Sequence, residues 1–218
     1  MADLPSPAFA SVIFDLDGTL IDSSEDIARA LNKAIASYGA GGVTQQHVAQ
    51  ALGGGPRILV EKCLAAANIT VTDAQLEDIL RDYSRNYMAA PAERTRLLDT
   101  AGPVIRRLHD RGIAIGVCTN KRTAIAVEVL RALGLTDLIG AVIGTDATSA
   151  PKPHPQHLID TAAALHVSPA SVLYVGDTAI DRHTAAAAGV TYAHVAWGEP
   201  GSPSDIRLGS FDDLLAIV

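Results

Sequence analysis

Five short apolar runs without charged residues stand out along the chain, and each is a predicted strand. Such runs are typical of strands that a parallel sheet buries on both faces, because neither face of the strand meets water. The predicted strands are Ser11–Phe14, Ile113–Cys118, Leu138–Ile143, Val172–Val175 and Tyr192–Val195.

Helical patterns separate these strands in the second half of the chain. In Ala101–Arg111, the apolar residues Val104, Ile105 and Leu108 recur at helical spacing, and Gly112 follows as a stop signal. The alternation of strands and helices predicts an α/β fold, a doubly wound parallel sheet. The other predicted helices of this half are Thr123–Leu133, Asp160–Leu165 and Thr178–Ala188.

One stretch interrupts the alternation, because no strand is predicted between Ile21 and about Leu98. Gly39, Gly41 and Gly42 are expected to end the first helix of this stretch. We therefore predict a helical domain of residues 22–98, inserted into an α/β core domain of residues 1–21 and 99–218. The predicted helices of the insert are Ser24–Tyr38, Gln45–Leu52, Pro56–Ala67 and Asp73–Met88.

The composition makes several classes of protein unexpected. The 17 basic and 24 acidic residues give a net charge of −7, and aromatic residues make up only 4%, so nucleic acid is not an expected partner. Two cysteines cannot form a disulfide framework or a thiolate zinc site. The N-terminus lacks the pattern of a signal peptide, and no apolar run reaches the ~18 residues of a membrane span. We therefore expect a cytoplasmic protein without membrane contact.

The most informative segment follows the first predicted strand and carries two acidic residues. Asp15 and Asp17 are two positions apart, so an extended backbone places both carboxylates on one side while Leu16 points into the core. Gly18 then allows the chain to turn sharply. A polar turn that merely ends a strand is the simpler alternative for these residues.

A second pair of acidic residues follows the fourth predicted strand. Asp177 lies at the strand end, and Asp181 lies in the first turn of the next helix, where the helix dipole alone would favour an acid. If the first and fourth strands are neighbours, the four carboxylates crowd together, and two like charges ~4 Å apart repel by roughly 4 kcal/mol. Such a cluster needs protons or a cation, and oxygen ligands favour Mg²⁺.

Two smaller signals lie elsewhere in the predicted core domain. Thr119 and Asn120 place a hydroxyl and an amide after the second strand, although both residue types are common in ordinary turns. Lys152 stands between Pro151 and Pro153, which hold the backbone extended and aim the lysine side chain. Most lysines are solvated surface residues, but a fixed cation next to an acidic metal site suits a phosphate substrate.

In chain order, these elements resemble the motifs of the haloacid dehalogenase-like phosphatase superfamily. The match extends from Ser11 to about Val195, and the helical insert resembles the type-one cap of that superfamily. Within the superfamily, Thr119-Asn120-Lys121 resembles the phosphoglycolate phosphatase-like subgroup. The matching motifs are Asp15-Leu16-Asp17-Gly18-Thr19, Thr119-Asn120, Lys152, and Gly176-Asp177 with Asp181.

The resemblance implies a Mg²⁺-dependent phosphatase that forms an aspartyl-phosphate. Asp15 would attack phosphorus, and Asp17 would protonate the leaving alkoxide and later deprotonate the attacking water. Thr119 and Lys152 would hold the phosphoryl oxygens. The implied metal set is Asp15, Asp17 through its carbonyl, Asp177 and Asp181, the last as a support or an occasional ligand. The implied substrate-binding set includes Gly18, Thr19 and Asn120.

The insert is expected to close over the site and to select the leaving group. Within it, residues 53–56 form a predicted flexible glycine-rich loop, and Arg57 at its end would bind a substrate carboxylate. An arginine that only opens a helix fits this pattern equally well. The expected substrate is a small phosphorylated metabolite, with 2-phosphoglycolate as the first candidate.

Two other functions fit the same residues. A sugar-phosphate mutase would return the phosphoryl group to its substrate, and a regulatory or binding protein would use the pocket without turnover. The acid at Asp17 favours phosphoester hydrolysis or phosphoryl transfer over dehalogenation, which has no leaving alkoxide to protonate. The sequence is compatible with a monomer or a homodimer.

Overall fold

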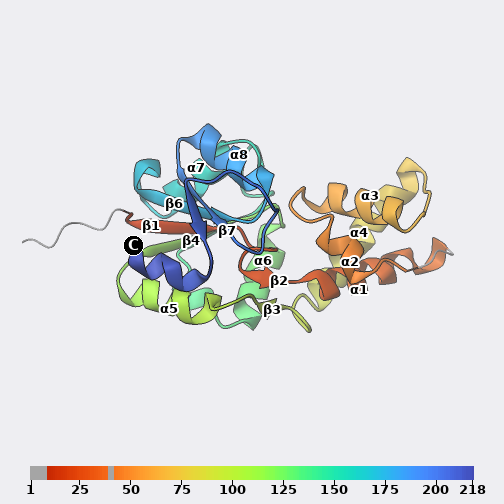
Figure 1. Ribbon diagram of the computed structural model, residues 1–218. Helices are drawn as coiled ribbons and strands as arrows, with labels where there is room; N and C mark the ends of the chain where they lie inside the picture. The colour runs from red at the N-terminus through yellow and green to blue at the C-terminus, as the bar shows by residue number, and fades with distance from the viewer. Residues whose placement is uncertain (1–8, 39–41) are drawn as a thin grey trace, which may run out of the picture.

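In the computed structural model, a six-stranded parallel sheet forms the centre of the larger part of the molecule (Figure 1). Its strand order is β5-β4-β1-β6-β7-β8, so the first strand of the chain lies inside the sheet. This arrangement confirms the predicted doubly wound fold. The strands are β1 (Ser11–Phe14), β4 (Ala114–Cys118), β5 (Ala141–Ile143), β6 (Val172–Gly176), β7 (Thr191–Val195) and β8 (Ile206–Leu208).

The structure describes residues 9–38 and 42–218. The expectation that no signal peptide is present rests largely on residues 1–8, and two of the glycines expected to end the first helix are Gly39 and Gly41. Both expectations therefore lie outside the described residues. Within the two described ranges, no helix combines the length and the apolar character that crossing a bilayer requires.

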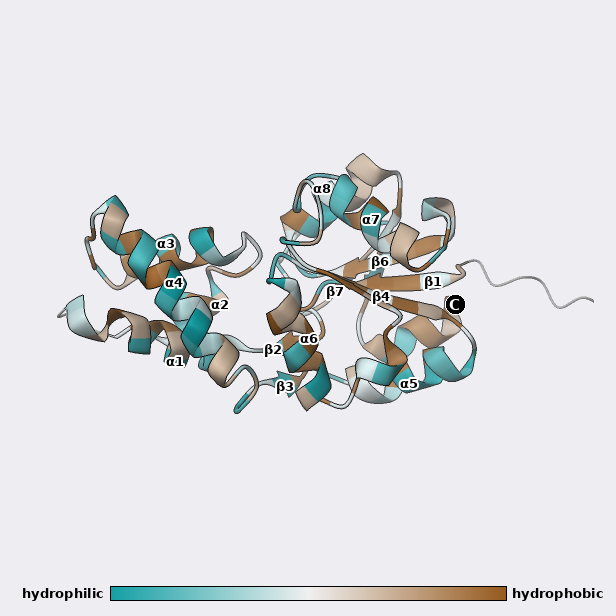
Figure 2. Ribbon diagram, turned by 180° about the vertical axis from the view of Figure 1, so that it is seen from behind, coloured by the Kyte–Doolittle hydropathy of each residue, from teal (hydrophilic) through white to brown (hydrophobic). Residues whose placement is uncertain are grey.

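Helices cover both faces of the sheet, because side chains alternate along each strand. In β1, Val12 and Phe14 belong to one cluster of buried side chains together with residues of α5 and α6, whereas Ile13 belongs to a second cluster with residues of α7 and α8. Figure 2 shows the strands as a largely hydrophobic layer between helices with polar outer surfaces. These helices are α5 (Ala101–Asp110), α6 (Thr123–Ala132), α7 (Gln156–Ala164) and α8 (Ala179–Ala188).

Four further helices form a second lobe, the cap, at the end of the sheet where β1 finishes (Figure 1). A two-stranded antiparallel ribbon of β2 (Ile21–Asp22) and β3 (Arg96–Leu97) lies at the two chain crossings between core and cap. The prediction that no strand lies between residues 21 and 98 is therefore wrong at β3, because two residues are too few to show a period. This ribbon lies beside the predicted boundaries at residues 21–22 and 98–99, and the division into two domains stays a prediction. The cap helices are α1 (Ser24–Ile35), α2 (Gln45–Ala49), α3 (Pro56–Ala66) and α4 (Asp73–Ala89).

The other differences between the predicted and the observed elements involve only a few residues each. Strand β5 begins at Ala141 because the residues before it include a 3-10 turn, and α7 begins four residues before the predicted Asp160. Strand β8 was not predicted, since Arg207 at its centre breaks the apolar pattern. The 3-10 helices are Ala36–Tyr38, Thr136–Leu138, Pro169–Ser171 and Phe211–Ala216.

Candidate active site

The carboxyl ends of three neighbouring strands bring the predicted site residues together. Strand β1 lies between β4 and β6, with Phe14 paired to Val117 on one side and to Val175 on the other. The first and fourth predicted strands are therefore neighbours, which is the condition under which their carboxylates come together. As a result, Asp15 lies between the residues that follow β4 and those that follow β6.

Three buried carboxylates, which we call the acid cluster, form the deepest part of the site. Asp15, Asp177 and Asp181 each contribute an oxygen, and these oxygens lie within 4.8 Å of one another. The ammonium of Lys152 lies 2.9 Å from Asp15 Oδ1 and 2.6 Å from Asp181 Oδ1. The lysine between the two prolines is therefore buried and compensates part of the negative charge.

The three carboxylates differ in their affinity for protons. Burial raises the pKa of Asp15 to about 7, although Lys152 opposes that rise. Burial, with Asp181 and Asp15 adding to its effect, raises the pKa of Asp177 well above its usual value. Burial would also raise the pKa of Asp181, but the charge of Lys152 and several hydrogen bonds together lower it. Lys152 thus compensates the charge of Asp181 well, whereas a negative charge on Asp15 or Asp177 is less well stabilised.

The donor atoms of the acid cluster fit a hard divalent cation. Asp181 Oδ1 accepts hydrogen bonds from Lys152 and Tyr174, and its Oδ2 accepts one from a hydroxyl at the start of α8, so Asp181 suits a positioning role. Asp15 and Asp177 offer carboxylate oxygens in an electron-rich site, which is the donor set that Mg²⁺ prefers. The acid cluster could therefore hold a metal ion, principally through these two residues.

The turn after β1 supports Asp177. Gly18 has φ +86°, and a Cβ at this position would lie 2.4 Å from Asp177 Oδ2, so a larger residue does not fit. The buried hydroxyl of Thr19 donates to Asp177 Oδ1 at 2.7 Å. The structure therefore places Thr19 on a carboxylate of the acid cluster and not on the substrate side that the resemblance implies. Gly18 lies beside Asp177 at an opening between the core and the cap.

Asp17 faces a different set of partners. Its two carboxylate oxygens lie 2.8 and 2.7 Å from Nζ of Lys121, and the hydroxyl of Ser23 donates to its Oδ1. The ammonium of Lys121 also lies 4.8 Å from the centre of the Tyr87 ring on α4. Because Lys121 and Ser23 engage this carboxylate, the metal contact implied for Asp17 would use its backbone carbonyl.

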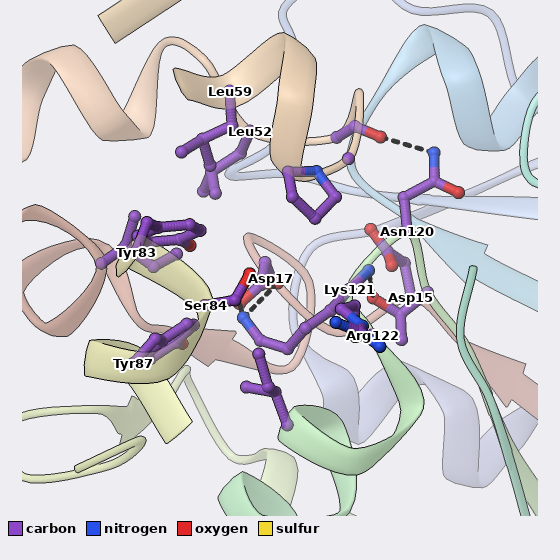
Figure 3. Close-up of a pocket in the computed structure, with 16 residues that line it drawn as sticks. Asp15, Asp17, Leu52, Leu59, Tyr83, Ser84, Tyr87, Asn120, Lys121 and Arg122 are labelled. Carbon is purple, nitrogen blue, oxygen red and sulfur yellow. Dashed lines mark hydrogen bonds and ion pairs between the residues drawn. The ribbon is translucent and has the colours of Figure 1, made fainter. Parts of the chain in front are cut away.

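Asp15 and Asp17 line a cavity between the core and the cap, where Figure 3 shows the cap side chains facing the strand ends. Thr119 and Asn120 line the same cavity from the end of β4. Asn120 Nδ2 donates to the carbonyl of Gly53 at 2.8 Å and so connects the core to the loop before α3. Most of the cap side is apolar or aromatic. The cap residues that line the cavity include Leu52, Gly53, Pro56, Leu59, Tyr83, Ser84 and Tyr87.

Arg57 is not among the residues that line this cavity. Its guanidinium is half exposed and pairs with Glu61, one turn further along α3, and with Glu77 on α4. These two acids hold the arginine on the surface of the cap. The predicted contact between Arg57 and a substrate carboxylate is therefore not supported by this geometry.

Sequence reasoning did not place Lys121 in the site, although the residue follows Thr119 and Asn120 directly. The available signals were that position and the resemblance of Thr119-Asn120-Lys121 to the subgroup, but a lysine after a strand end is usually solvated. Tyr83 and Tyr87 were also missed. They lie four positions apart on α4, and this spacing is equally typical of a buried helix face.

Comparisons with known proteins agree with this geometry. A family model described as haloacid dehalogenase-like hydrolase matches residues 12–195. The chain is 38% identical over 182 residues to a phosphoglycolate phosphatase of Cereibacter sphaeroides, which covers 84% of this chain and 83% of the relative. It is 34% identical over 219 residues to a phosphoglycolate phosphatase of Yersinia pestis, covering 97% and 94%. A crystal structure described as a predicted phosphoglycolate phosphatase from Haemophilus somnus superposes with a TM-score of 0.87 at 25% identity, covering 96% and 98%.

The chain therefore belongs to the haloacid dehalogenase-like hydrolases. The predictions of this superfamily, of its phosphoglycolate phosphatase-like subgroup and of a phosphatase are confirmed by the family match and by these relatives. The assignment of individual residues to roles stays a prediction, as do the cytoplasmic location and the choice between monomer and homodimer.

Proposed function

We propose that the protein is a Mg²⁺-dependent phosphatase that hydrolyses a small phosphomonoester, 2-phosphoglycolate, through a phosphorylated Asp15. One observation carries the proposal. Asp15 lies at a strand end with Lys152 2.9 Å away, while Asp17 lines the same cavity with separate partners. This arrangement supports attack by Asp15 and proton transfer by Asp17.

In the first half of the reaction, a carboxylate oxygen of Asp15 attacks phosphorus and the bond from phosphorus to the alcohol oxygen breaks. Asp17 gives its proton to that oxygen, so the alcohol leaves uncharged. In the second half, Asp17 takes a proton from a water molecule that attacks the phosphorylated Asp15. Inorganic phosphate leaves, and Asp15 and Asp17 return to their starting states.

Lys152 and Thr119 are the groups that would hold the phosphoryl oxygens. Lys152 brings a buried positive charge to the place where negative charge develops, which favours the transition state. Asp181 holds the ammonium of Lys152 at 2.6 Å and thereby directs it. Asp15, Asp177 and the carbonyl of Asp17 would hold Mg²⁺, and the bound ion would offset the negative charges of phosphate and carboxylate.

Two observations support a small substrate: the descriptions of the related proteins and the side chains that the cap contributes to the cavity. Three of the proteins compared above are described as phosphoglycolate phosphatases. The cap side of the cavity consists mainly of apolar and aromatic side chains such as Leu52, Leu59 and Tyr83, which offer few hydrogen bonds to a sugar. A mutase would need such bonds to hold a second hydroxyl, so the geometry favours hydrolysis of a compact ester.

Phosphate release from a panel of phosphomonoesters tests the proposal. The panel contains 2-phosphoglycolate, hexose phosphates and nucleoside monophosphates, each assayed with Mg²⁺ and with EDTA. We expect turnover that requires Mg²⁺ and is fastest for 2-phosphoglycolate. Fast release from another ester would retain the mechanism and reject the substrate. A folded protein that binds Mg²⁺ but releases phosphate from no ester would favour the mutase or the binding protein.

A further inference from the structure

Lys121 is a buried cation in the cavity wall that the reaction described above does not use. Its ammonium contacts both carboxylate oxygens of Asp17 and lies over the ring of Tyr87. Its backbone N–H donates to the hydroxyl of Thr119 at 3.1 Å, which fixes the start of the side chain next to the phosphate site. Lys121 is therefore held by the core and points toward the cap.

The contacts of Lys121 leave part of its ammonium for a ligand. An ammonium group has three N–H donors, and the two carboxylate oxygens of Asp17 accept two of those of Lys121. Among the contacts that the described residues make with this ammonium, the other partner is the Tyr87 ring, whose attraction is weaker than that of a full negative charge. The third N–H of the ammonium is therefore available to an anionic group that enters the cavity.

The position of Lys121 indicates where that anion must be. The leaving oxygen has to lie within hydrogen-bonding reach of Asp17, and the ammonium of Lys121 contacts the same carboxylate. An anionic group on the carbon that bears the leaving oxygen would therefore be within reach of Lys121. The cap residues that close the cavity, among them Tyr83 and Leu59, are mainly aromatic or apolar. Arg122, a second cation among the residues that line the cavity, already pairs with Asp146.

We propose that Lys121 binds a carboxylate on the leaving group of the substrate and so selects carboxylate-bearing phosphoesters. In the free enzyme, Lys121 pairs with Asp17. When the substrate binds, its carboxylate accepts a hydrogen bond from the ammonium of Lys121, next to Asp17. The inference rests on the proposed function, because it assigns to one residue the preference for 2-phosphoglycolate.

Two substrates that differ only in this group test the inference. In 2-hydroxyethyl phosphate, a neutral hydroxymethyl group replaces the carboxylate of 2-phosphoglycolate while the chain length stays the same. We expect the wild-type enzyme to prefer 2-phosphoglycolate by about 100-fold in kcat/KM, the size expected for losing a hydrogen bond to a charged group. Lys121→Met should reduce this preference to less than about 5-fold, and Lys121→Arg should retain more of it, since the charge is kept.

The controls distinguish a loss of substrate preference from a general loss of activity. Lys62→Met makes the same change on the exposed surface of the cap and should leave the preference unchanged. The outcome that contradicts the inference is a Lys121→Met enzyme that loses activity toward both substrates by the same factor, because Lys121 would then only position Asp17. Equal activity of the wild-type enzyme toward both substrates would contradict it too, whether or not the variant folds. If the wild-type enzyme releases phosphate from neither substrate, the proposed function itself fails.

Discussion

The acid cluster and the Asp17–Lys121 pair are both charged parts of one site, but different parts of the chain hold them. Asp15, Asp177 and Asp181 with Lys152 all come from the core, and the partners of Lys152 are core residues. Asp17 instead contacts Ser23 at the start of the cap, and Lys121 lies over Tyr87 on α4. The acid cluster is thus complete without the cap, whereas the pair lies at the boundary between the two lobes.

The two parts correspond to two proposed tasks of the site, namely phosphate transfer and proton transfer to the leaving alcohol. The groups proposed to bind and transfer phosphate depend on the strand ends of the sheet and are buried by them. The group proposed to move the proton lies next to side chains of the cap, where the leaving alcohol would bind. Under this proposal, selection of the leaving group and proton transfer to it share the same few contacts, whereas the phosphate would be held by core residues alone.

Replacing the proposed nucleophile gives the largest expected effect. Asp15→Asn removes the attacking carboxylate, so phosphate release should fall by about 10,000-fold or more. The fold should survive, because asparagine has the same shape and the loss of a buried charge relieves repulsion with Asp181. Phosphate release and a thermal unfolding curve check both parts. Activity close to that of the wild type would contradict the assignment of Asp15.

Removing Lys152 should damage stability as well as activity. Lys152→Met leaves Asp15 and Asp181 buried without their cation, and breaking a buried ion pair in this way costs about 3–5 kcal/mol. Urea unfolding without Mg²⁺ measures this loss. Adding Asp181→Asn in the same chain should recover part of it, since one of the unpaired charges is then gone.

The comparison between the two lysines predicts a smaller loss of stability when Lys121 is replaced than when Lys152 is replaced. Asp17 retains Ser23 as a hydrogen-bond donor and lines the cavity, so Lys121→Met should destabilise the protein by about 1–2 kcal/mol, less than Lys152→Met. Urea unfolding of the two variants side by side tests the order. Equal losses would mean that the boundary pair is as essential to the fold as the acid cluster.

The sequence predicted those parts of the site that follow from short-range rules. Asp15 and Asp177 come directly after charge-free strands, and the carboxyl ends of neighbouring parallel strands meet at one edge, so their proximity could be inferred. The positions of Thr19 and Arg57 could not be, because each depends on a side-chain contact with a residue far away in the chain. The same holds for Lys121, whose burial depends on α4.

The prediction of strands from the sequence has the same limit, because it detects local patterns and not contacts between distant residues. Strands such as β1 and β6 were predicted to within one residue, since burial on both faces leaves a continuous apolar run. The ribbon of β2 and β3 was not, although it lies where the chain enters and leaves the cap. Its two-residue strands are held by pairing between residues more than 70 positions apart, and no local pattern records that pairing.

A buried histidine next to Lys152 makes the stability of the protein depend on pH. His157 Nδ1 accepts from the backbone N–H of Lys152 at 3.1 Å, and its Nε2 donates to the carbonyl of Ile143 at 3.0 Å, so the neutral ring satisfies both bonds. Burial lowers the pKa of His157 from 6.5 to about 4. Because the folded-state pKa is depressed, its contribution to stability is complete above pH 6.5 and is lost as the pH falls toward 4.

We expect this one residue to lower the free energy of unfolding by about 2–3 kcal/mol between pH 7.5 and 4.5. The glutamine in His157→Gln can accept and donate in similar places but does not titrate, so the variant should lose correspondingly less stability over this range. Urea unfolding of both proteins at the two pH values measures the difference. Parallel losses in the two proteins would show that other groups control the acid sensitivity.

The smallest expected effect comes from the arginine at the start of α3. Arg57 pairs with Glu61 and Glu77 at the surface, and exposed ion pairs contribute about 0–1 kcal/mol to stability. Arg57→Met should therefore change kcat/KM for 2-phosphoglycolate by less than about 2-fold, since a side chain outside the cavity has no anion of the substrate to bind. A loss of about 50-fold, confined to KM, would instead mean that Arg57 leaves its two acids and enters the cavity when substrate binds. That result would move selection of the carboxylate from the core side of the boundary, where Lys121 lies, to the cap.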